Sequence, residues 1–428
     1  MRITKNGESI VSSFGYIFIL FILTFFSLSP LSIAEGKKVK YETPGSRSAS
    51  TFIPADVIKG THYEVQDEVV AYEYMDHFEV NSDYGEFSVT GDGALYKLLF
   101  EIGAITELKK IKDTDVYLDA VKEAGKSPYK FAQNMITNPV DTVTGVPKGV
   151  GRLFSNIKTG LTRKSDPSED DTAKELLKVS GCKRQYAAKL NVDVYSSNTE
   201  LQKELNSIGW ACATGGLTLS VLTFPISNPA LSVVKGVNTA QNVSDVIADT
   251  PPPRLRYLAN EKLLEMGISE ELAAQFLDHP SYTPRHDAII VGSLYKLGDA
   301  GGRDKFIEYA LSSEDEVESN FFMDMAQIMR EYNENVSPIK NITVKEPFVL
   351  AEAENGTVLI PFPMDYGVWT EIADKATGEV KKSYKADGGK GNMELWVTGT
   401  LSPTAKTQLT ARGIEPVEKV RKKFKIMY

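Results

Sequence analysis

An uncharged, apolar segment follows a short basic start at the beginning of the chain. Arg2 and Lys5 precede it, and no charged residue lies between Val11 and Ala34. Pro30 interrupts the apolar run, and Ser32-Ile33-Ala34 places small residues at the −3 and −1 positions of a cleavage site. The pattern predicts a signal peptide over residues 1–34, cleaved after Ala34. The alternative is an uncleaved anchor, because this segment is long enough to span a bilayer.

Export to an oxidising compartment constrains how the remaining chain is stabilised. Cys182 and Cys212 are the only two cysteines, and such a pair normally bridges outside the cytosol. We therefore predict one disulfide, which contributes about 3–4 kcal/mol in the chain-entropy model. The alternative is two buried free thiols. So few cysteines exclude a disulfide-dense scaffold and favour a bacterial envelope over eukaryotic secretion.

The composition is that of a globular protein with two or three domains. The 428 residues are 42% hydrophobic and 25% charged, and 57 acidic against 48 basic residues give a formal net charge of −9. An acidic chain is a poor candidate for nucleic-acid binding, because that affinity comes mainly from neutralising phosphates. We expect no nucleic-acid partner.

The hydrophobic periodicity changes along the chain and predicts an α+β fold that is mainly α. An N-terminal β-hairpin is expected over 69–89, with its turn at 81–85, and apolar residues then recur every three or four positions from Leu95 to Ile111, as on a buried helix face. A central bundle of short helices and helical hairpins follows. Its helices are expected at 172–190 and 199–213, and about five more between Leu255 and Asn335.

Local signals predict where the later elements begin and end. Gly267 is expected to end a helix, Thr283-Pro284 to begin one, and Ser313 with Glu316 to form a capping box. A small C-terminal α+β domain is expected from a hairpin with a type I′ turn at Asn355-Gly356, a strand over 393–397, a helix over 402–411 and extended chain from Ile414, with one crossover. The expected domains are a signal peptide (1–34), a flexible lead-in (35–66), a β-hairpin plus helical domain (67–250), a helical-hairpin domain (251–337) and the α+β domain (338–428).

The sequence contains one concentrated group of histidines and acids. Asp278-His279 and His286-Asp287 flank a turn that contains proline, and imidazole with carboxylate serves both hydrolysis and metal binding. The spacing matches no H-E-x-x-H pattern, and the chain has no G-x-S-x-G elbow. Histidines at helix ends commonly cap and pack, which is the interpretation we favour. We predict no catalytic residue, no cofactor and no metal ligand.

A basic amphipathic helix is expected over Val146–Leu161. Its apolar residues fall on one arc, and most of its bases point away from that arc. The favoured interpretation is a helix packed on the protein body. The alternative is contact with a membrane or a partner. The face comprises Val146, Lys148, Val150, Arg152, Leu153, Phe154, Ile157, Lys158 and Leu161. Leu205–Val234 is a second uncharged stretch, interrupted by glycine and proline, and is expected to be a buried helical hairpin.

These features favour an exported, non-enzymatic envelope protein with a binding or scaffolding role, periplasmic or secreted. The expected partners are other envelope proteins or a membrane surface. One alternative is a periplasmic hydrolase that uses the His279/His286 region. Another is a protein that inserts into a membrane through Val146–Leu161 and Leu205–Val234.

Overall fold

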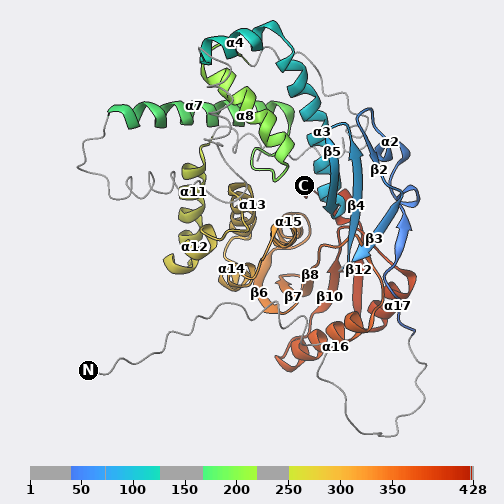
Figure 1. Ribbon diagram of the computed structural model, residues 1–428. Coiled ribbons are helices and arrows are strands. Elements are labelled where there is room, and N and C mark those ends of the chain that lie inside the picture. Colours follow the sequence, from blue (N-terminus) through green and yellow to red (C-terminus); the bar gives the residue numbers. More distant parts are fainter. Residues whose placement is uncertain (1–39, 73, 126–166, 219–249, 425, 427–428) are drawn as a thin grey trace, which may run out of the picture. The chain divides into compact units, whose positions relative to one another are not determined.

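The computed structural model describes residues 40–72, 74–125, 167–218, 250–424 and 426 (Figure 1). The chain divides into two units, Met1–Tyr41 and Glu42–Tyr428, and the elements described below belong to the second. The predicted signal peptide and the amphipathic face of Val146–Leu161 lie outside the described residues, as does the part of Leu205–Val234 beyond residue 218. None of the described helices combines the length and the apolar character needed to cross a membrane.

The N-terminal part is an antiparallel sheet built around one long strand, β4. β4 pairs with β2 and β3 along one edge and with β5 along the other. The hairpin with its turn at 81–85 is confirmed, but the expected first strand from Val69 to Val80 is in fact two antiparallel strands, β3 and β4. A flexible lead-in is expected over 35–66. Its residues 46–65 instead form β1, η1, α2 and β2. These strands span three residues each, too few for alternation to be recognised. The elements are β1 (Ser46–Ser48), η1 (Ala49–Thr51), α2 (Ala55–Ile58), β2 (Tyr63–Val65), β3 (Glu68–Tyr72), β4 (Met75–Ser82) and β5 (Gly85–Thr90).

Helix α3 (Asp92–Lys112) connects this sheet to the helical region, and its position confirms the periodicity seen in the sequence. Its first half, including Leu95 and Leu99, packs with Phe78 and Val80 of the sheet. Its second half, including Ile105 and Leu108, joins a core that it shares with α4, α7 and α8. One helix therefore contributes to two cores along its length.

Helices α7 and α8 form an antiparallel hairpin joined by a disulfide. Cys182 of α7 and Cys212 of α8 are bonded, with Cα atoms 6.1 Å apart, which confirms the predicted bridge. The predicted turn between the helices ends at Asn198, whose side chain accepts from the amides of Glu200 and Leu201 and so caps α8. The bounds are α4 (Asp115–Gly125), α7 (Pro167–Leu190) and α8 (Thr199–Ala213).

Five helices follow in the described part of the chain from residue 252 to 335, as predicted. Gly267, with φ +81°, ends α11 as expected, because glycine accepts this conformation without strain. The predicted capping box of Ser313 and Glu316 is wrong. Asp315 caps α15 instead, and the Ser313 hydroxyl bonds the Asp315 carbonyl. The helices are α11 (Pro252–Glu265), α12 (Glu270–Leu277), α13 (Pro284–Tyr295), α14 (Arg303–Ala310) and α15 (Glu316–Asn335).

The C-terminal sheet has the order β12-β10-β8-β7-β6. β6, β7 and β8 are antiparallel, whereas β8, β10 and β12 are parallel, so two helical crossovers, through α16 and α17, replace the single one expected. The turn at Asn355-Gly356 is not type I′. Only Gly356 has a positive φ, and the hairpin closes through a three-residue loop. The elements are β6 (Ile339–Lys345), β7 (Phe348–Ala353), β8 (Thr357–Pro361), β9 (Tyr366–Gly367), α16 (Glu371–Ala386), β10 (Asn392–Trp396), β11 (Thr400–Leu401), α17 (Pro403–Ala411), β12 (Ile414–Val417) and α18 (Val420–Lys423).

The helical array and the C-terminal sheet share one hydrophobic core. Ile290 of α13 and Met325 and Met329 of α15 are fully buried in the same cluster as Val349 and Leu359 of the sheet. Figure 1 shows α15 on one side of this sheet and α16 and α17 on the other. The ranges 251–337 and 338–428 thus bury their apolar faces against each other, as layered folds require.

Candidate functional site

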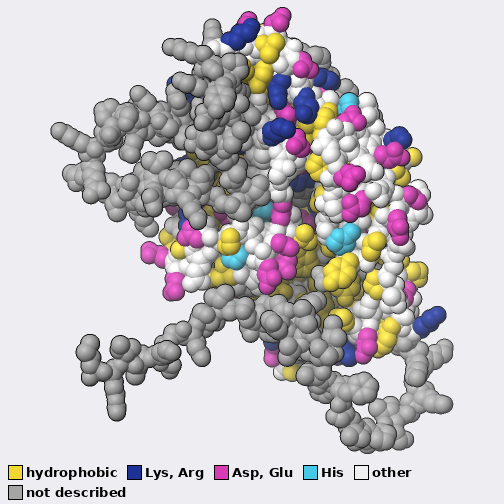
Figure 2. Space-filling model, in the orientation of Figure 1, with side chains coloured by type: hydrophobic (Ala, Val, Ile, Leu, Met, Phe, Trp, Pro, Cys, Tyr) yellow, Lys and Arg dark blue, Asp and Glu magenta, His cyan; other side chains and the backbone are white. Residues whose placement is uncertain are grey.

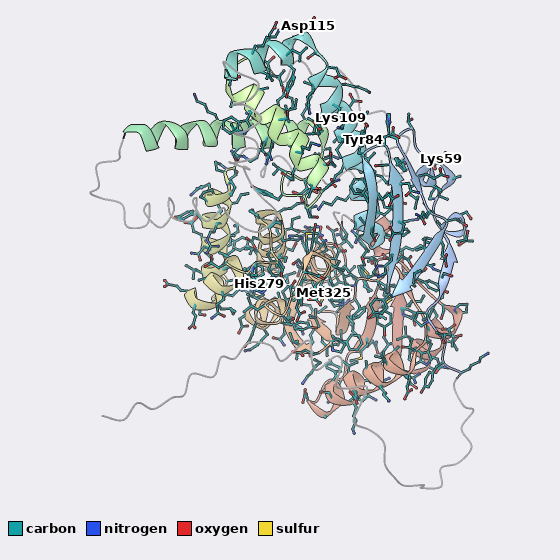
Figure 3. The ribbon with its side chains drawn as sticks, viewed as in Figure 1. Lys59, Tyr84, Lys109, Asp115, His279 and Met325 are labelled. Carbon is teal, nitrogen blue, oxygen red and sulfur yellow. A yellow bond between two sulfur atoms is a disulfide. The ribbon has the colours of Figure 1, made fainter. Side chains whose placement is uncertain are left out.

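The acid–histidine group predicted from the sequence lies where α12 ends and α13 begins. Asp278 ends α12, is largely exposed, and pairs with Arg256 at 2.8 Å. His279 follows it (Figure 3), and its ring centroid lies 5.4 Å from that of Tyr282. Burial lowers the pKa of His279 from its ordinary value. These contacts are those of a helix end packed on its neighbour.

His286 has both ring nitrogens engaged, one in the capping of α13 and the other in a contact with α15. Nδ1 accepts from the backbone N–H of Thr283 at 3.1 Å, and Nε2 lies 3.1 Å from the Asn320 side-chain oxygen. This arrangement requires the neutral tautomer that carries its proton on Nε2. Burial, reinforced by the nearby Arg285 cation, lowers the pKa of His286 to about 4. The ring is therefore neutral at neutral pH and holds the helix start together.

Asp287 is buried beside His286, and one of its carboxylate oxygens has no hydrogen-bond partner among the described residues. Burial raises its pKa well above the ordinary value, with Arg256 opposing this effect. A neutral carboxyl in this position avoids the cost of burying an unpaired charge. Asp278, His279 and His286 thus take part in separate contacts, and the capping and packing role of the whole group stays a prediction.

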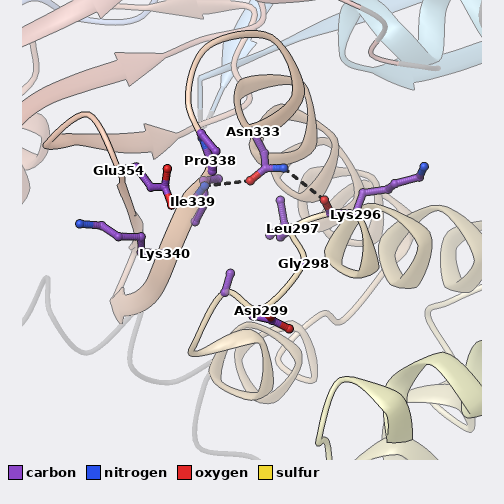
Figure 4. A pocket seen from close by; sticks show the side chains of 10 residues that line it. Lys296, Leu297, Gly298, Asp299, Asn333, Pro338, Ile339, Lys340 and Glu354 are labelled. Carbon is purple, nitrogen blue, oxygen red and sulfur yellow. Dashed lines mark hydrogen bonds between the residues drawn. The ribbon is translucent and has the colours of Figure 1, made fainter.

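A surface hollow of about 450 Å³ lies between the loop after α13 and the start of β6 (Figure 4). Asn333 crosses it, donating to the Lys296 carbonyl at 3.1 Å and accepting from the Ile339 amide at 2.8 Å. Two lysines and two acids, Lys296, Lys340, Asp299 and Glu354, line it together with backbone and small apolar residues. Its lining offers no histidine, cysteine or hydroxyl nucleophile, and none of the four predicted polar residues reaches it.

A buried ionic network joins α3 to the helical array. Lys97 of α3 lies 3.1 Å from Glu316 of α15 and 3.5 Å from Asp193 in the turn before α8. Arg285 of α13 lies 3.9 Å from the same Asp193 carboxylate. Burial alone would raise the pKa of Asp193, but Lys97 and Arg285 together lower it below its ordinary value. The pairing keeps these groups charged and links four separate segments: α3, the turn before α8, α13 and α15.

Three carboxylates from distant parts of the sequence converge beside the first turn of α3. Asp76 lies on β4, Asp92 begins α3, and Asp365 precedes β9. One oxygen from each lies within 4.8 Å of the other two. Asp365 Oδ2 accepts from the backbone N–H groups of Asp76 at 3.0 Å and Asp92 at 3.1 Å, so this carboxylate bridges β4 and α3.

Arg47 of β1 is the cation that contacts this cluster directly. Its guanidinium donates to Asp76 Oδ2. It is held between the rings of Phe52 and Tyr366, with centroids 4.1 and 4.0 Å from Cζ. Cation–π contacts on both faces fix the guanidinium in place. Arg47 therefore compensates one of the three carboxylates.

Burial and mutual repulsion dominate the electrostatics of the three carboxyl groups. Burial raises the pKa of Asp92 to about 6, and the Asp76 charge adds to the effect. Burial, followed by repulsion from Asp92, raises the pKa of Asp365 well above its ordinary value. The pKa of Asp76 is also raised by burial, although Arg47 opposes this. The cations Arg421, Arg47 and Lys422 oppose the rise in the pKa of Asp92 without cancelling it.

Two glycines, Gly399 and Gly91, allow the backbone segments around the three carboxylates to pack closely together. A Cβ on Gly399 would lie 2.0 Å from the carbonyl oxygen of Asp365, a distance that no side chain tolerates. Gly91 precedes α3 with φ +98°, and a Cβ there would meet Met75 Cε at 3.1 Å. No sequence pattern predicts this cluster, because its members share no local spacing.

No protein-family model, curated protein or solved structure matches the chain. The function of the protein is therefore inferred from its residues and their geometry.

Proposed function

We propose that this protein is an exported, non-enzymatic envelope protein that binds or scaffolds other envelope proteins. The observation that carries the proposal is the outer face of β3. Val70 is 49% exposed and Tyr72 is 60% exposed on this strand, whereas the alternate residues Val69 and Ala71 are buried. Figure 2 shows apolar side chains at the surface over this sheet. Tyrosine is enriched at protein interfaces because it buries a large ring and keeps a polar end.

Two further observations support the proposal. The Cys182–Cys212 bridge is the kind of bond that persists in an oxidising compartment, which supports export. A hydrolase that used the His279/His286 region would need an imidazole able to accept a proton from water or a nucleophile. Both nitrogens of His286 already have partners, which supports a structural role over a catalytic one.

The test compares the β3 face with an equally exposed site elsewhere. Wild type, Val70→Thr/Tyr72→Ser and the control Tyr257→Ser, whose side chain is 51% exposed on α11, would be cross-linked in cells and analysed by quantitative mass spectrometry. We expect a partner recovered with wild type and the control, and reduced at least about tenfold with the β3 variant, as for residues central to an interface. Equal recovery with all three proteins, or no partner with any, would argue against the proposal.

A membrane surface is the second partner class, and it concerns residues outside the described part of the chain. Lys148→Glu with Arg152→Glu should leave vesicle binding unchanged if the amphipathic face of Val146–Leu161 packs on the protein body. Binding that rises with anionic lipid, falls with salt and disappears in the double variant would support the membrane alternative instead.

A further inference from the structure

We propose that Asp76, Asp92 and Asp365 form a binding site for one divalent cation, with Ca²⁺ the best fit. The site would lie where β4, the start of α3 and the segment before β9 meet. A bound cation would thereby join the N-terminal sheet to the C-terminal part of the chain. The proposal concerns a structural ion and does not depend on the binding role proposed above.

The first argument is the convergence of hard oxygen ligands from three independent elements. Ca²⁺ binds carboxylate and carbonyl oxygens at about 2.3–2.6 Å, so two of its ligands lie at most about 5 Å apart. The three carboxylate oxygens here are mutually within 4.8 Å. Mg²⁺ is usually held by one or two carboxylates and keeps several waters, whereas Ca²⁺ takes about six to eight oxygen ligands, many of them from the protein. Three converging carboxylates therefore favour Ca²⁺.

The second argument is an oxygen that lacks a partner. The side chain of Asp76 is only 1% exposed, and Arg47 contacts its Oδ2. Oδ1 is fully buried and has no hydrogen-bond partner among the described residues. A buried carboxylate oxygen with neither donor nor cation is costly, because it has lost its water. A cation shared with Asp92 and Asp365 would supply the missing interaction.

The third argument is that the protein already holds the ligands in place. The two backbone N–H groups that bond Asp365 Oδ2 fix this carboxylate against the other two. They also place its negative charge at the start of α3, where the helix dipole favours it, so a cation would face the carboxylates rather than the bare helix end. Asp92 is only partly buried, which leaves a route for the waters that complete a Ca²⁺ shell.

Three basic side chains act on the cluster. Arg47 contacts Asp76. Arg421, which is hydrogen-bonded to Asp324, and Lys422 act on Asp92. A divalent ion would add two positive charges shared by all three carboxylates.

The test is the thermal stability and Ca²⁺ stoichiometry of the purified full chain. Melting would be followed in EDTA, in about 10 mM CaCl₂ or MgCl₂, and in NaCl of equal ionic strength. With an affinity near about 0.1 mM, as in extracellular calcium modules, CaCl₂ should raise Tm by about 3–5 °C over EDTA. Equilibrium dialysis with ⁴⁵Ca²⁺ should find one ion per chain.

Asp92→Asn should abolish both the shift and the bound ion, because it keeps the shape and removes a ligand charge. In EDTA this variant should melt no lower than wild type, since one of three repelling charges is gone. The matched control Asp119→Asn, on the exposed face of α4, should keep both responses.

No Ca²⁺-specific shift and no bound ion in wild type would overturn the proposal, whatever the variants do. Retention of both responses in Asp92→Asn would overturn the assignment of the ion to this cluster. An equal response to Mg²⁺ would overturn the preference for Ca²⁺. Failure of the cross-linking test at Tyr72 would leave these outcomes unaffected, so the two proposals can fail separately.

Discussion

Replacement of His286 by glutamine should make the stability of the protein less sensitive to acid. In the folded state burial lowers the pKa of His286 to about 4, against 6.5 for an unperturbed histidine. Between pH 6.5 and about 4 the unfolded state therefore binds a proton at His286 that the folded state does not bind. The stability that the neutral ring contributes is fully present above pH 6.5 and is lost as the pH falls towards 4.

The magnitude follows from the two pKa values. One pKa unit corresponds to about 1.4 kcal/mol, so His286 alone should reduce the free energy of unfolding by about 3 kcal/mol between pH 7.5 and 4. Protonation at Nδ1 would also break the hydrogen bond from the Thr283 amide. Burial and the nearby Arg285 cation are the main reasons for the low pKa of His286. Glutamine at this position keeps the usual partner of a capping box and cannot titrate.

Urea unfolding at several pH values between 7.5 and 4 would measure the effect as the difference between wild type and His286→Gln. We expect this difference to change by about 3 kcal/mol in favour of the variant as the pH falls, whatever its value at pH 7.5. Buried carboxyls such as Asp287 are common to both proteins and cancel. His279→Gln is the matched control, and its effect should be smaller because that ring is only partly buried. A difference that stays flat from pH 7.5 to 4 would refute the assignment of His286 as a buried, neutral capping residue.

Three further outcomes are expected from single changes. Reduction of the Cys182–Cys212 bridge, or Cys212→Ser, should lower the free energy of unfolding by about 3–4 kcal/mol, because the bond closes a loop with a sequence separation of 30; an unchanged urea midpoint under reducing conditions would contradict this. Gly399→Ala should destabilise by about 3 kcal/mol or more, because its Cβ would overlap the Asp365 carbonyl. Gly378→Ala, at a helical position with nothing within 4 Å, should stabilise by about 1 kcal/mol, and equal melting temperatures for the two alanine variants would contradict both expectations.

The sequence predicted the elements whose signals are local. The apolar spacing from Leu95 to Ile111 corresponds to α3, and Gly267 ends α11 as expected. The hydrophobic pattern does not predict helix α16. This helix buries mainly Thr377 and Val380, and most of its other residues are polar. The edge strands β1 and β2 were missed because their pairing depends on residues further along the chain.

The candidate site could not be predicted from local pattern. Asp76 and Asp92 are separated from Asp365 by 289 and 273 positions, and only the folding of two sheets brings them together. The acid–histidine group, in contrast, is visible in the local sequence. His286 and Asp287 lie beside a turn, and in the structure His286 caps the helix that begins at this turn.

Export of this chain is the claim on which both its location and its proposed partners depend. The measurement that tests it most directly is non-reducing peptide mapping, by mass spectrometry, of the protein recovered from the cell envelope. We expect an N-terminal peptide that begins at Glu35 and a linked pair of peptides that contains Cys182 and Cys212. A protein that begins at Met1 with both cysteines as free thiols would contradict the account.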